Sequence, residues 1–338
     1  MGRVLVTGGA GYIGSHVMVV LGRKGYRCVC LDNFSNSSPR AVERAQVLAP
    51  GAIEAVEADI RDTEALRRVL AGADISSVIH LAGLKAVGES VEKPALYRDN
   101  NVRGTQCLLE ALAGSGVRTF VFSSSATVYG NATAMPIGED APTAPASPYG
   151  ENKLEIERML AKLAGEDPSW RVASLRYFNP VGAHESGTIG EHPSGTPNNL
   201  MPYVCQAAAG LRGPLRVFGT DYPTPDGTGI RDYIHVMDLA EGHMAALTAL
   251  PLTPPGTVMT VNLGTGMGHS VLEVVDTFER VNGVKVPREL AGRRPGDVPI
   301  CYADCSRARQ LLRWSSRRTL EDMCRDAWRW QVLNPAGY

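Results

Sequence analysis

Short runs rich in β-branched residues alternate with longer amphipathic stretches through the first 180 residues, and this alternation constrains the fold more than any other feature. The runs, bounded by turn residues, predict six strands, at residues 3–7, 27–32, 53–58, 77–82, 118–123 and 171–177. Helical periodicity predicts helices between them, at residues 12–24, 63–71, 94–114 and 148–164. Each strand, helix and following strand forms a right-handed parallel unit. We therefore expect an α/β protein with a doubly wound parallel sheet.

The second half of the chain has a different composition, because Gly, Pro, Asn and His accumulate in expected loops after residue 180. Its predicted elements are helices near residues 202–211, 235–250, 270–281 and 319–333 and a strand at residues 257–263. We predict a first domain of residues 1–180, to which residues 235–263 return. A smaller, loop-rich domain is predicted for residues 181–338.

Composition argues against several classes of function. The formal net charge is −1, so no strong field attracts nucleic acid or an anionic membrane as a partner. The apolar runs are far shorter than the roughly 20 residues of a membrane-spanning helix, and the first residues lack the pattern of a signal peptide. The seven cysteines form no C-x-x-C pair, and no histidine lies at zinc-ligand spacing. We expect reduced thiols, no metal site and a cytoplasmic protein.

A glycine-rich turn joins the first predicted strand to the first predicted helix. Gly8, Gly11 and Gly14 fit the spacing G-x-x-G-x-x-G, which gives a tight turn and lets backbone N–H groups at a helix terminus approach a diphosphate. Asp32 follows at the end of the second predicted strand, where a carboxylate accepts hydrogen bonds from the adenosine ribose. A carboxylate there repels a 2′-phosphate. The pattern predicts a Rossmann-type domain that binds NAD rather than NADP.

A second motif begins the helix predicted at residues 148–164. Tyr149 and Lys153 are four residues apart and so share one helical face. A phenol has a pKa near 10, and a neighbouring ammonium lowers it, so we expect Tyr149 to act as a general base. Ser125 follows the strand predicted at residues 118–123, at the edge where doubly wound sheets bind ligands. Its hydroxyl is expected beside the reacting oxygen.

Several longer motifs give the chain a family resemblance. They include T-G-G-A-G-Y-I-G-S-H, H-L-A-G-L-K-A-V-G-E-S, S-S-S-A-T-V-Y-G, S-P-Y-G-E-N-K and P-N-N-L-M-P. With these motifs the chain resembles the UDP-galactose 4-epimerases, within the extended short-chain dehydrogenases/reductases. The resemblance runs from Arg3 to the tail, and one small departure is Asn152, where the family usually has Ser or Thr.

The resemblance implies two sets of contacts. The residues implied to contact NAD are Gly8, Gly11, Tyr12, Ile13, Gly14, Asp32, Asn33, Asn36, Ser37, Asp59, Ile60, Ala82, Gly83, Lys85, Asn100, Ser123, Tyr149, Lys153 and Tyr177. The residues implied to contact the UDP-sugar are Lys85, Ser125, Tyr149, Phe178, Asn179, Asn199, Leu200, Phe218, Arg231, Tyr233, Arg294, Asp297 and Cys301. Catalysis is expected from Ser125, Tyr149 and Lys153.

The resemblance also implies an activity, the reversible 4-epimerisation of UDP-glucose and UDP-galactose through a transient 4-keto sugar, and a homodimer built on residues 94–114 and 148–164. Two alternatives remain open. The first is a nucleotide-sugar 4,6-dehydratase or decarboxylase. Those enzymes carry a second acid/base pair at the positions where this chain has Ala126 and Thr127, which argues against this alternative. A non-catalytic NAD-sensing protein on the same fold is the other.

Cys301 carries a hypothesis about substrate range. In the epimerases that the chain resembles, this position bounds the pocket beside C2 of the sugar. A tyrosine there accompanies restriction to UDP-glucose and UDP-galactose, whereas a cysteine accompanies acceptance of the N-acetyl sugars. A thiol leaves room that a phenol fills. We therefore expect UDP-GlcNAc and UDP-GalNAc to be accepted as well.

Overall fold

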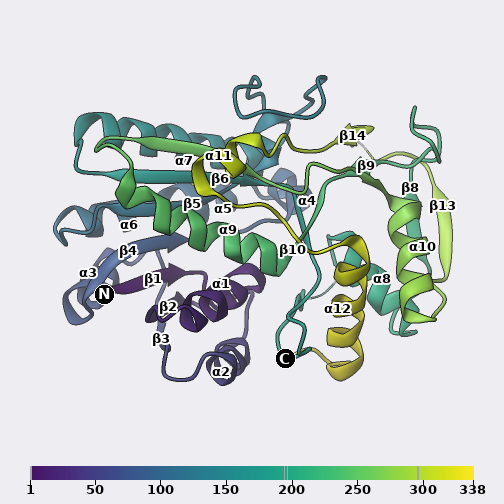
Figure 1. Ribbon diagram of the computed structural model, residues 1–338, viewed down its shortest axis with the longest axis horizontal. Coiled ribbons are helices and arrows are strands. Elements are labelled where there is room, and N and C mark those ends of the chain that lie inside the picture. The colour runs from purple at the N-terminus through teal and green to yellow at the C-terminus, as the bar shows by residue number, and fades with distance from the viewer. Residues whose placement is uncertain (1, 194, 196, 295–296) are drawn as a thin grey trace.

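The computed structural model describes residues 2–193, 195, 197–294 and 297–338. Its centre is a seven-stranded, wholly parallel sheet in the order β11-β6-β5-β4-β1-β2-β3 (Figure 1). The strands are β1 (Arg3–Thr7), β2 (Cys28–Asp32), β3 (Ile53–Glu57), β4 (Ile75–His80), β5 (Thr119–Ser125), β6 (Arg171–Tyr177) and β11 (Val258–Leu263). The predicted α/β fold with a doubly wound sheet is confirmed.

The two faces of this sheet have separate apolar cores, because neighbouring residues of a strand point to opposite faces. In β1, Val4 and Val6 belong to one core and Leu5 to the other, and all three are buried. The first core is covered by α1 (Tyr12–Arg23), α2 (Pro39–Leu48) and α9 (Val236–Ala249). The second is covered by α3 (Thr63–Gly72), α6 (Gly104–Ala113) and α7 (Pro148–Glu166). Strands buried on both faces explain the continuous apolar runs of the sequence.

The single helix predicted for residues 94–114 is wrong as one unbroken α-helix. The structure has α5 (Pro94–Arg98), a π-helical turn at Asp99–Arg103 and then α6. Asn101 lies in the π turn, where its side chain accepts a hydrogen bond from the Leu84 N–H and donates one to the Leu84 carbonyl. These bonds tie the turn to the loop that follows β4. Before α5 lies α4 (Val87–Glu92), which the sequence analysis did not predict.

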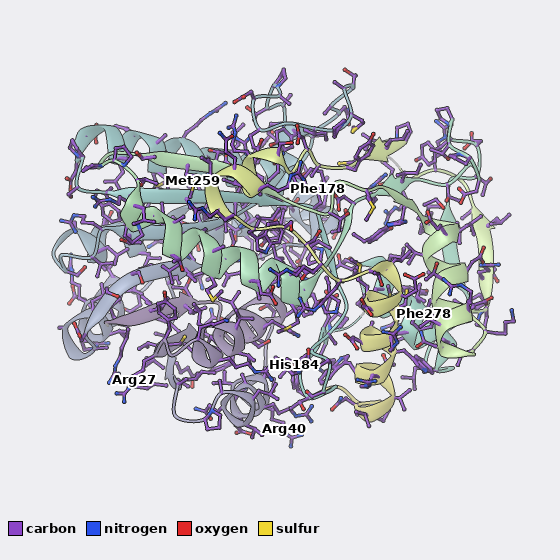
Figure 2. The ribbon with its side chains drawn as sticks, in the orientation of Figure 1. Arg27, Arg40, Phe178, His184, Met259 and Phe278 are labelled. Atoms are coloured by element: carbon purple, nitrogen blue, oxygen red, sulfur yellow. The ribbon has the colours of Figure 1, made fainter. Side chains whose placement is uncertain are left out.

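The second half of the chain forms three small sheets and several helices to the right of the large sheet in Figure 1. The short strands are β7 (Asn179–Val181), β8 (Leu215–Phe218), β9 (Ile230–Arg231), β10 (Tyr233–His235), β12 (His269–Ser270), β13 (Arg288–Ala291) and β14 (Ile300–Cys301). The helices are α8 (Leu200–Ala208), α10 (Val271–Asn282), α11 (Ser306–Leu312) and α12 (Leu320–Leu333). Phe278 of α10, labelled in Figure 2, packs edge-on against Trp328 of α12 with their ring centroids 5.6 Å apart.

Three segments from the second half return to the large sheet, namely β11, α9 and α11, whose Ala308 and Leu312 belong to the first core. Strand β11 pairs in parallel with β6, Val258 lying opposite Val172, and α9 packs on α1. Short 3₁₀ turns occur at Ala126–Tyr129 and Leu250–Leu252. Within the described residues, no helix has the length and apolar character that crossing a bilayer requires.

Candidate active site

The glycine-rich turn is shaped by close backbone contacts. Gly8 has a φ of +68°, and a Cβ there would lie 2.6 Å from the Ala82 nitrogen. A Cβ on Gly14 would lie 2.3 Å from the Gly8 oxygen. Helix α1 then begins at Tyr12 with no side-chain cap and no acidic residue in its first turn. The turn therefore leaves the positive end of α1 free for a diphosphate, which is the fit that NAD requires.

Polar residues at the ends of β2 and β3 lie beside this turn. The Asp32 carboxylate accepts hydrogen bonds from the Ala10 N–H at 3.0 Å and from the Ser37 hydroxyl at 2.9 Å. Asn33 donates to the Asp59 carboxylate at 2.8 Å. Arg61 hydrogen-bonds the same carboxylate and holds the pKa of Asp59 well below its usual range. The structure thus brings these predicted cofactor residues together at the carboxyl ends of β2 and β3. Asn36 is exposed in the loop that follows β2.

The loop after β4 supplies the next predicted contacts. Gly83 approaches Asn101, and a Cβ on Gly83 would lie 3.2 Å from the Asn101 Oδ1 atom. Asn100 donates to the same oxygen at 3.0 Å. Lys85 extends from this loop to Glu191, at 3.0 Å.

Three predicted cofactor residues lie deeper in the protein. Ile60 is buried in the core, where it packs closely against Gly104. The Ser123 hydroxyl is fully buried and hydrogen-bonds the His243 ring at 2.8 Å. Tyr177 lies 6.0 Å from the same ring, between centroids, and burial raises the pKa of its phenol.

Helix α7 brings Tyr149 and Lys153 together on one face. The Ser147 hydroxyl caps the helix by accepting from the Gly150 N–H, and Pro148 occupies its first turn. The Lys153 ammonium donates to the Ser123 carbonyl at 2.7 Å and lies 5.8 Å from the centroid of the Tyr149 ring. The Ser125 side chain lies close enough to the Tyr149 phenol to lower its pKa, and its hydroxyl accepts from the Thr127 N–H at 3.2 Å. The predicted catalytic residues therefore meet at the carboxyl end of β5.

The protonation of this group bears on the expectation that the Lys153 ammonium, together with the oxidised nicotinamide ring, lowers the pKa of the Tyr149 phenol. Burial raises the pKa of Tyr149 to about 12, and the hydrogen bond to Ser125 opposes that rise. Burial also lowers the pKa of Lys153 to about 8, against the influence of Glu157. In the chain alone the phenol pKa is raised because burial is the largest influence, and the predicted lowering, which includes the charge of the nicotinamide, stays a prediction. Further positive charge is needed before Tyr149 can act as a base at neutral pH.

A cleft of about 400 Å³ lies between the small sheets and α8. Its wall includes most of the residues predicted for the UDP-sugar, namely Asn179, Asn199, Leu200, Phe218, Arg231, Tyr233, Arg294 and Asp297. Among the described residues, those predicted for the UDP-sugar that lie outside this wall are Lys85, Ser125, Tyr149, Phe178 and Cys301.

The wall of the cleft is cationic. Asp297 lies between two guanidinium groups, 3.6 Å from that of Arg231 and 3.0 Å from that of Arg294. The Arg294 guanidinium also lies over the Phe218 ring, 5.0 Å from its centroid. Arg216 lies over the same ring at 5.1 Å and lines the cleft, although the sequence analysis missed it. Residues two apart on a strand share a face, so the spacing of Arg216 and Phe218 in β8 was the available signal.

Cys301 lies beside Arg231, a residue of the cleft wall. It pairs with Arg231 across β14 and β9 and packs against the apolar cluster that contains Phe178. Burial raises the pKa of its thiol to about 11, so the side chain is neutral at physiological pH. All seven cysteines are free, and no group of three or more potential metal ligands occurs in the part of the chain that the structure describes.

A glycine cradle, a Tyr–Lys pair and an arginine-lined cleft define a nucleotide-sugar enzyme of the short-chain dehydrogenase type. Residues 4–264 match the NAD dependent epimerase/dehydratase family, and the chain belongs to that family. The chain is similar to the UDP-glucose 4-epimerase of Bacillus subtilis, with 55% identity over 99% of this chain and 98% of the relative.

Two solved structures match almost the whole fold. The UDP-glucose-4-epimerase of Stenotrophomonas maltophila, with bound NAD and formylated UDP-arabinopyranose, is 49% identical and has a TM-score of 0.96 over 99% of each chain. The UDP-glucose 4-epimerase of Bifidobacterium longum, in complex with NAD+ and UDP, is 48% identical and has a TM-score of 0.95, over 99% of this chain and 100% of that one.

Proposed function

We propose that this chain catalyses the NAD-dependent, reversible 4-epimerisation of UDP-glucose and UDP-galactose. The observation that carries the proposal is the meeting of Tyr149, Lys153 and Ser125 at the sheet edge that also holds the glycine cradle. The similarity to UDP-glucose 4-epimerases over essentially the full chain supports the same reaction. Ala126 and Thr127, which follow Ser125, lack the carboxylate that an elimination would use, so a dehydratase is disfavoured.

Both halves of the protein contribute to the proposed ligand sites. The glycine-rich turn would hold the diphosphate of NAD, and Asp32 with its neighbours would hold the adenosine ribose. NAD, when bound, supplies a hydride acceptor and donor for C4 of the sugar. We assign residues 1–180 and 235–263 to the cofactor domain and the other residues of 181–338 to the UDP-sugar domain.

Tyr149 is assigned the proton transfer at the sugar 4-hydroxyl. Its phenol is held by the Ser125 hydroxyl, and that hydroxyl is placed to donate to the developing carbonyl oxygen of a 4-keto sugar. Lys153 contributes positive charge below pH 8, which favours the phenolate. The oxidised nicotinamide ring is itself cationic, so its presence favours the phenolate in the same way.

The cleft is assigned to the UDP group. Arg231 and Arg294 present guanidinium forks that suit a diphosphate, and Asp297 can accept from ribose hydroxyls. Because the protein binds the nucleotide tightly and the hexose loosely, the hexose can rotate about its diphosphate link. Either face of C4 can then react. Inversion at C4 needs such a turn.

Three finer assignments belong to the same proposal. Cys301 would leave room for an acetamido group, so UDP-GlcNAc and UDP-GalNAc would also react. The chain would form a homodimer through residues 94–114 and 148–164, beside which Val91 of α4 is 63% exposed. The free cysteines suit a cytoplasmic location.

The test is to incubate the purified protein with UDP-galactose and to identify the products by nuclear magnetic resonance. The proposal predicts an equilibrium mixture of UDP-galactose and UDP-glucose, reached from either side. A stable 4-keto-6-deoxy sugar would instead show a dehydratase, and binding without turnover would show a non-catalytic protein. In a parallel incubation with a UDP-uronic acid, release of carbon dioxide would show a decarboxylase. Each of these results would contradict the epimerase.

A further inference from the structure

Glu191 connects the two proposed ligand sites through one oxygen atom. Lys85, on the loop after β4, donates to its Oε1 atom at 3.0 Å, and Asn199, in the wall of the cleft, donates to the same atom at 2.7 Å. The Glu191 side chain is 10% exposed. A buried carboxylate therefore joins a residue of the cofactor side to a residue of the UDP side.

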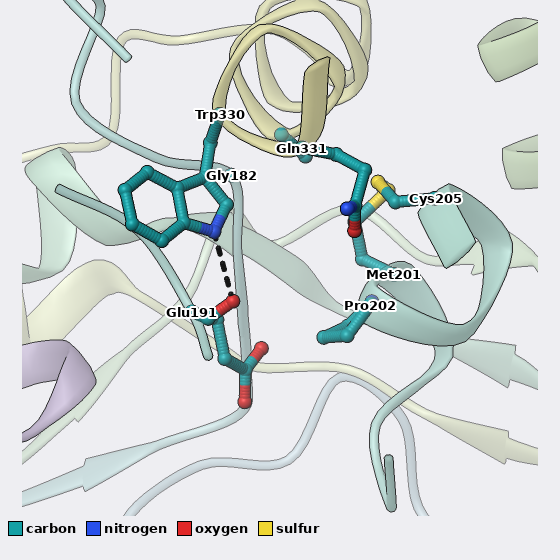
Figure 3. Close-up of a pocket in the computed structure, with 8 residues that line it drawn as sticks. Gly182, Glu191, Met201, Pro202, Cys205, Trp330 and Gln331 are labelled. Carbon is teal, nitrogen blue, oxygen red and sulfur yellow. Dashed lines mark hydrogen bonds between the residues drawn. The ribbon is translucent and has the colours of Figure 1, made fainter. Parts of the chain in front are cut away.

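The backbone around Glu191 is held in place from the end of the chain. The Trp330 indole N–H donates to the Glu191 carbonyl at 3.0 Å, the dashed line in Figure 3. The Tyr338 hydroxyl accepts from the Gly190 N–H at 3.1 Å and donates to the Gly190 carbonyl at 3.0 Å. Gly190 lies so close to Trp330 that a Cβ there would approach the indole to 2.4 Å. These contacts hold the backbone at Gly190 and Glu191 in place and so limit the positions that the Glu191 carboxylate can occupy.

Asn199 occupies the N-cap position of α8 but does not cap the helix. Asparagine at this position ordinarily accepts a hydrogen bond from an N–H of the first turn. Here its amide donates to Glu191 instead, and a carboxylate, which can only accept, determines which end of the amide faces it. Pro202 has no N–H, so the Met201 N–H is the one that an Asn199 cap would occupy. Among the described residues no side chain caps it, and the first turn lies beside the cleft, whose wall includes Asn199 and Leu200.

We propose that Glu191 is a positioning residue for UDP binding, because it diverts the Asn199 side chain away from the first turn of α8. The open helix terminus, with its partial positive charge, then faces the diphosphate. Lys85, bound to the same oxygen, holds the carboxylate in this position. The assignment rests on the proposed function, since it takes UDP as the occupant of the cleft.

The experiment measures the dissociation constant for UDP by calorimetry on the NAD-containing protein. Glu191→Met keeps the volume of the side chain but removes the acceptor, so Asn199 is free to cap α8. We expect UDP binding to weaken by about tenfold, the effect of one charge-assisted hydrogen bond. Glu191→Gln retains a carbonyl acceptor and should bind UDP within about threefold of the wild type. Glu191→Ala gives the same comparison if the methionine variant does not fold.

Two controls separate positioning from a general structural role. Glu185→Ala alters the same segment at an exposed side chain that pairs with Arg23 at 3.7 Å, and it should leave UDP affinity unchanged. In an Asn199→Ala background there is no side chain to divert, so Glu191→Met should no longer weaken UDP binding. Equal weakening in both backgrounds, or no weakening in the wild-type background, would overturn the proposal.

Epimerase assays on the same samples distinguish this proposal from the function on which it rests. Uniform loss of nucleotide binding should raise KM for UDP-galactose with little change in kcat. A wild-type protein that binds UDP but does not epimerise UDP-galactose would refute the proposed function. The UDP dissociation constants of the variants would still decide whether Glu191 positions Asn199. A wild-type protein that does not bind UDP would refute both.

Discussion

Replacing Lys153 by Met should change the pH dependence of the reaction more than it changes the fold. The ammonium lies 5.8 Å from the centroid of the Tyr149 ring. At an effective dielectric constant of about 20, a charge at that distance stabilises the phenolate by about 3 kcal/mol. This energy corresponds to about two pH units in the phenol pKa. Methionine keeps the length of the side chain and loses only the charge and its bond to the Ser123 carbonyl.

The sign of the effect follows from the two pKa values. Burial raises the pKa of Tyr149 to about 12, so its basic form is gained as pH rises. Burial lowers the pKa of Lys153 to about 8, so its side chain is mostly charged at pH 7. At that pH the ammonium therefore stabilises the phenolate. At pH 7 we expect the variant to lose about 100-fold in kcat. Its activity should rise about tenfold per pH unit and level off about two pH units above the pH at which the wild type levels off.

The assay is kcat for UDP-galactose from pH 6 to 10, with the content of bound NAD measured in each sample. The NAD content is needed because Lys153 is also predicted to contact the cofactor. A fully loaded variant whose pH profile runs parallel to that of the wild type would refute an electrostatic role for Lys153. The lysine would then act only by positioning.

Three further changes test other parts of the site. Tyr149→Phe should lower kcat by about 100- to 10,000-fold while UDP and NAD still bind, and turnover near the wild-type rate would exclude Tyr149 as the base. Asp32→Ala removes the acceptor for Ala10 and Ser37 and should weaken NAD binding and relax discrimination against NADP, as titration of the cofactor-free protein with both would show. Cys301→Tyr should abolish turnover of UDP-GlcNAc and spare UDP-galactose, and the hypothesis fails if the wild type never accepts the N-acetyl sugar.

The sequence predicted the large sheet well because its strands are buried on both faces. The bounds of β1 and β6 agree with the prediction to the residue, since their apolar runs end at turn residues. Helices α2 and α4 were missed. Ser90 is the buried residue of α4, and α2 buries only one side of a charged segment. Helix α4 has little apolar periodicity to detect, whereas α2 buries Ala41, Val42 and Ala45 on one side and was overlooked.

The site was predictable where its residues are close in sequence. Tyr149 and Lys153 are one helical turn apart, so a local spacing indicated their common face. Glu191 gave no such signal, because its partners Lys85 and Asn199 come from distant parts of the chain and meet only in the folded protein. The local motif did not reveal the burial of Tyr149, which is the largest influence on the pKa of its phenol in the chain alone.

The most direct test of the proposed mechanism follows the hydrogen on C4. UDP-galactose carrying deuterium at C4 is converted by the purified protein in ordinary water, and the UDP-glucose formed is examined by mass spectrometry. The account predicts that the deuterium stays on C4, because it leaves and returns as hydride within a closed site while Tyr149 handles only the hydroxyl proton. Replacement of the deuterium by hydrogen from water would contradict the account, since it would show that C4 inverts through proton exchange.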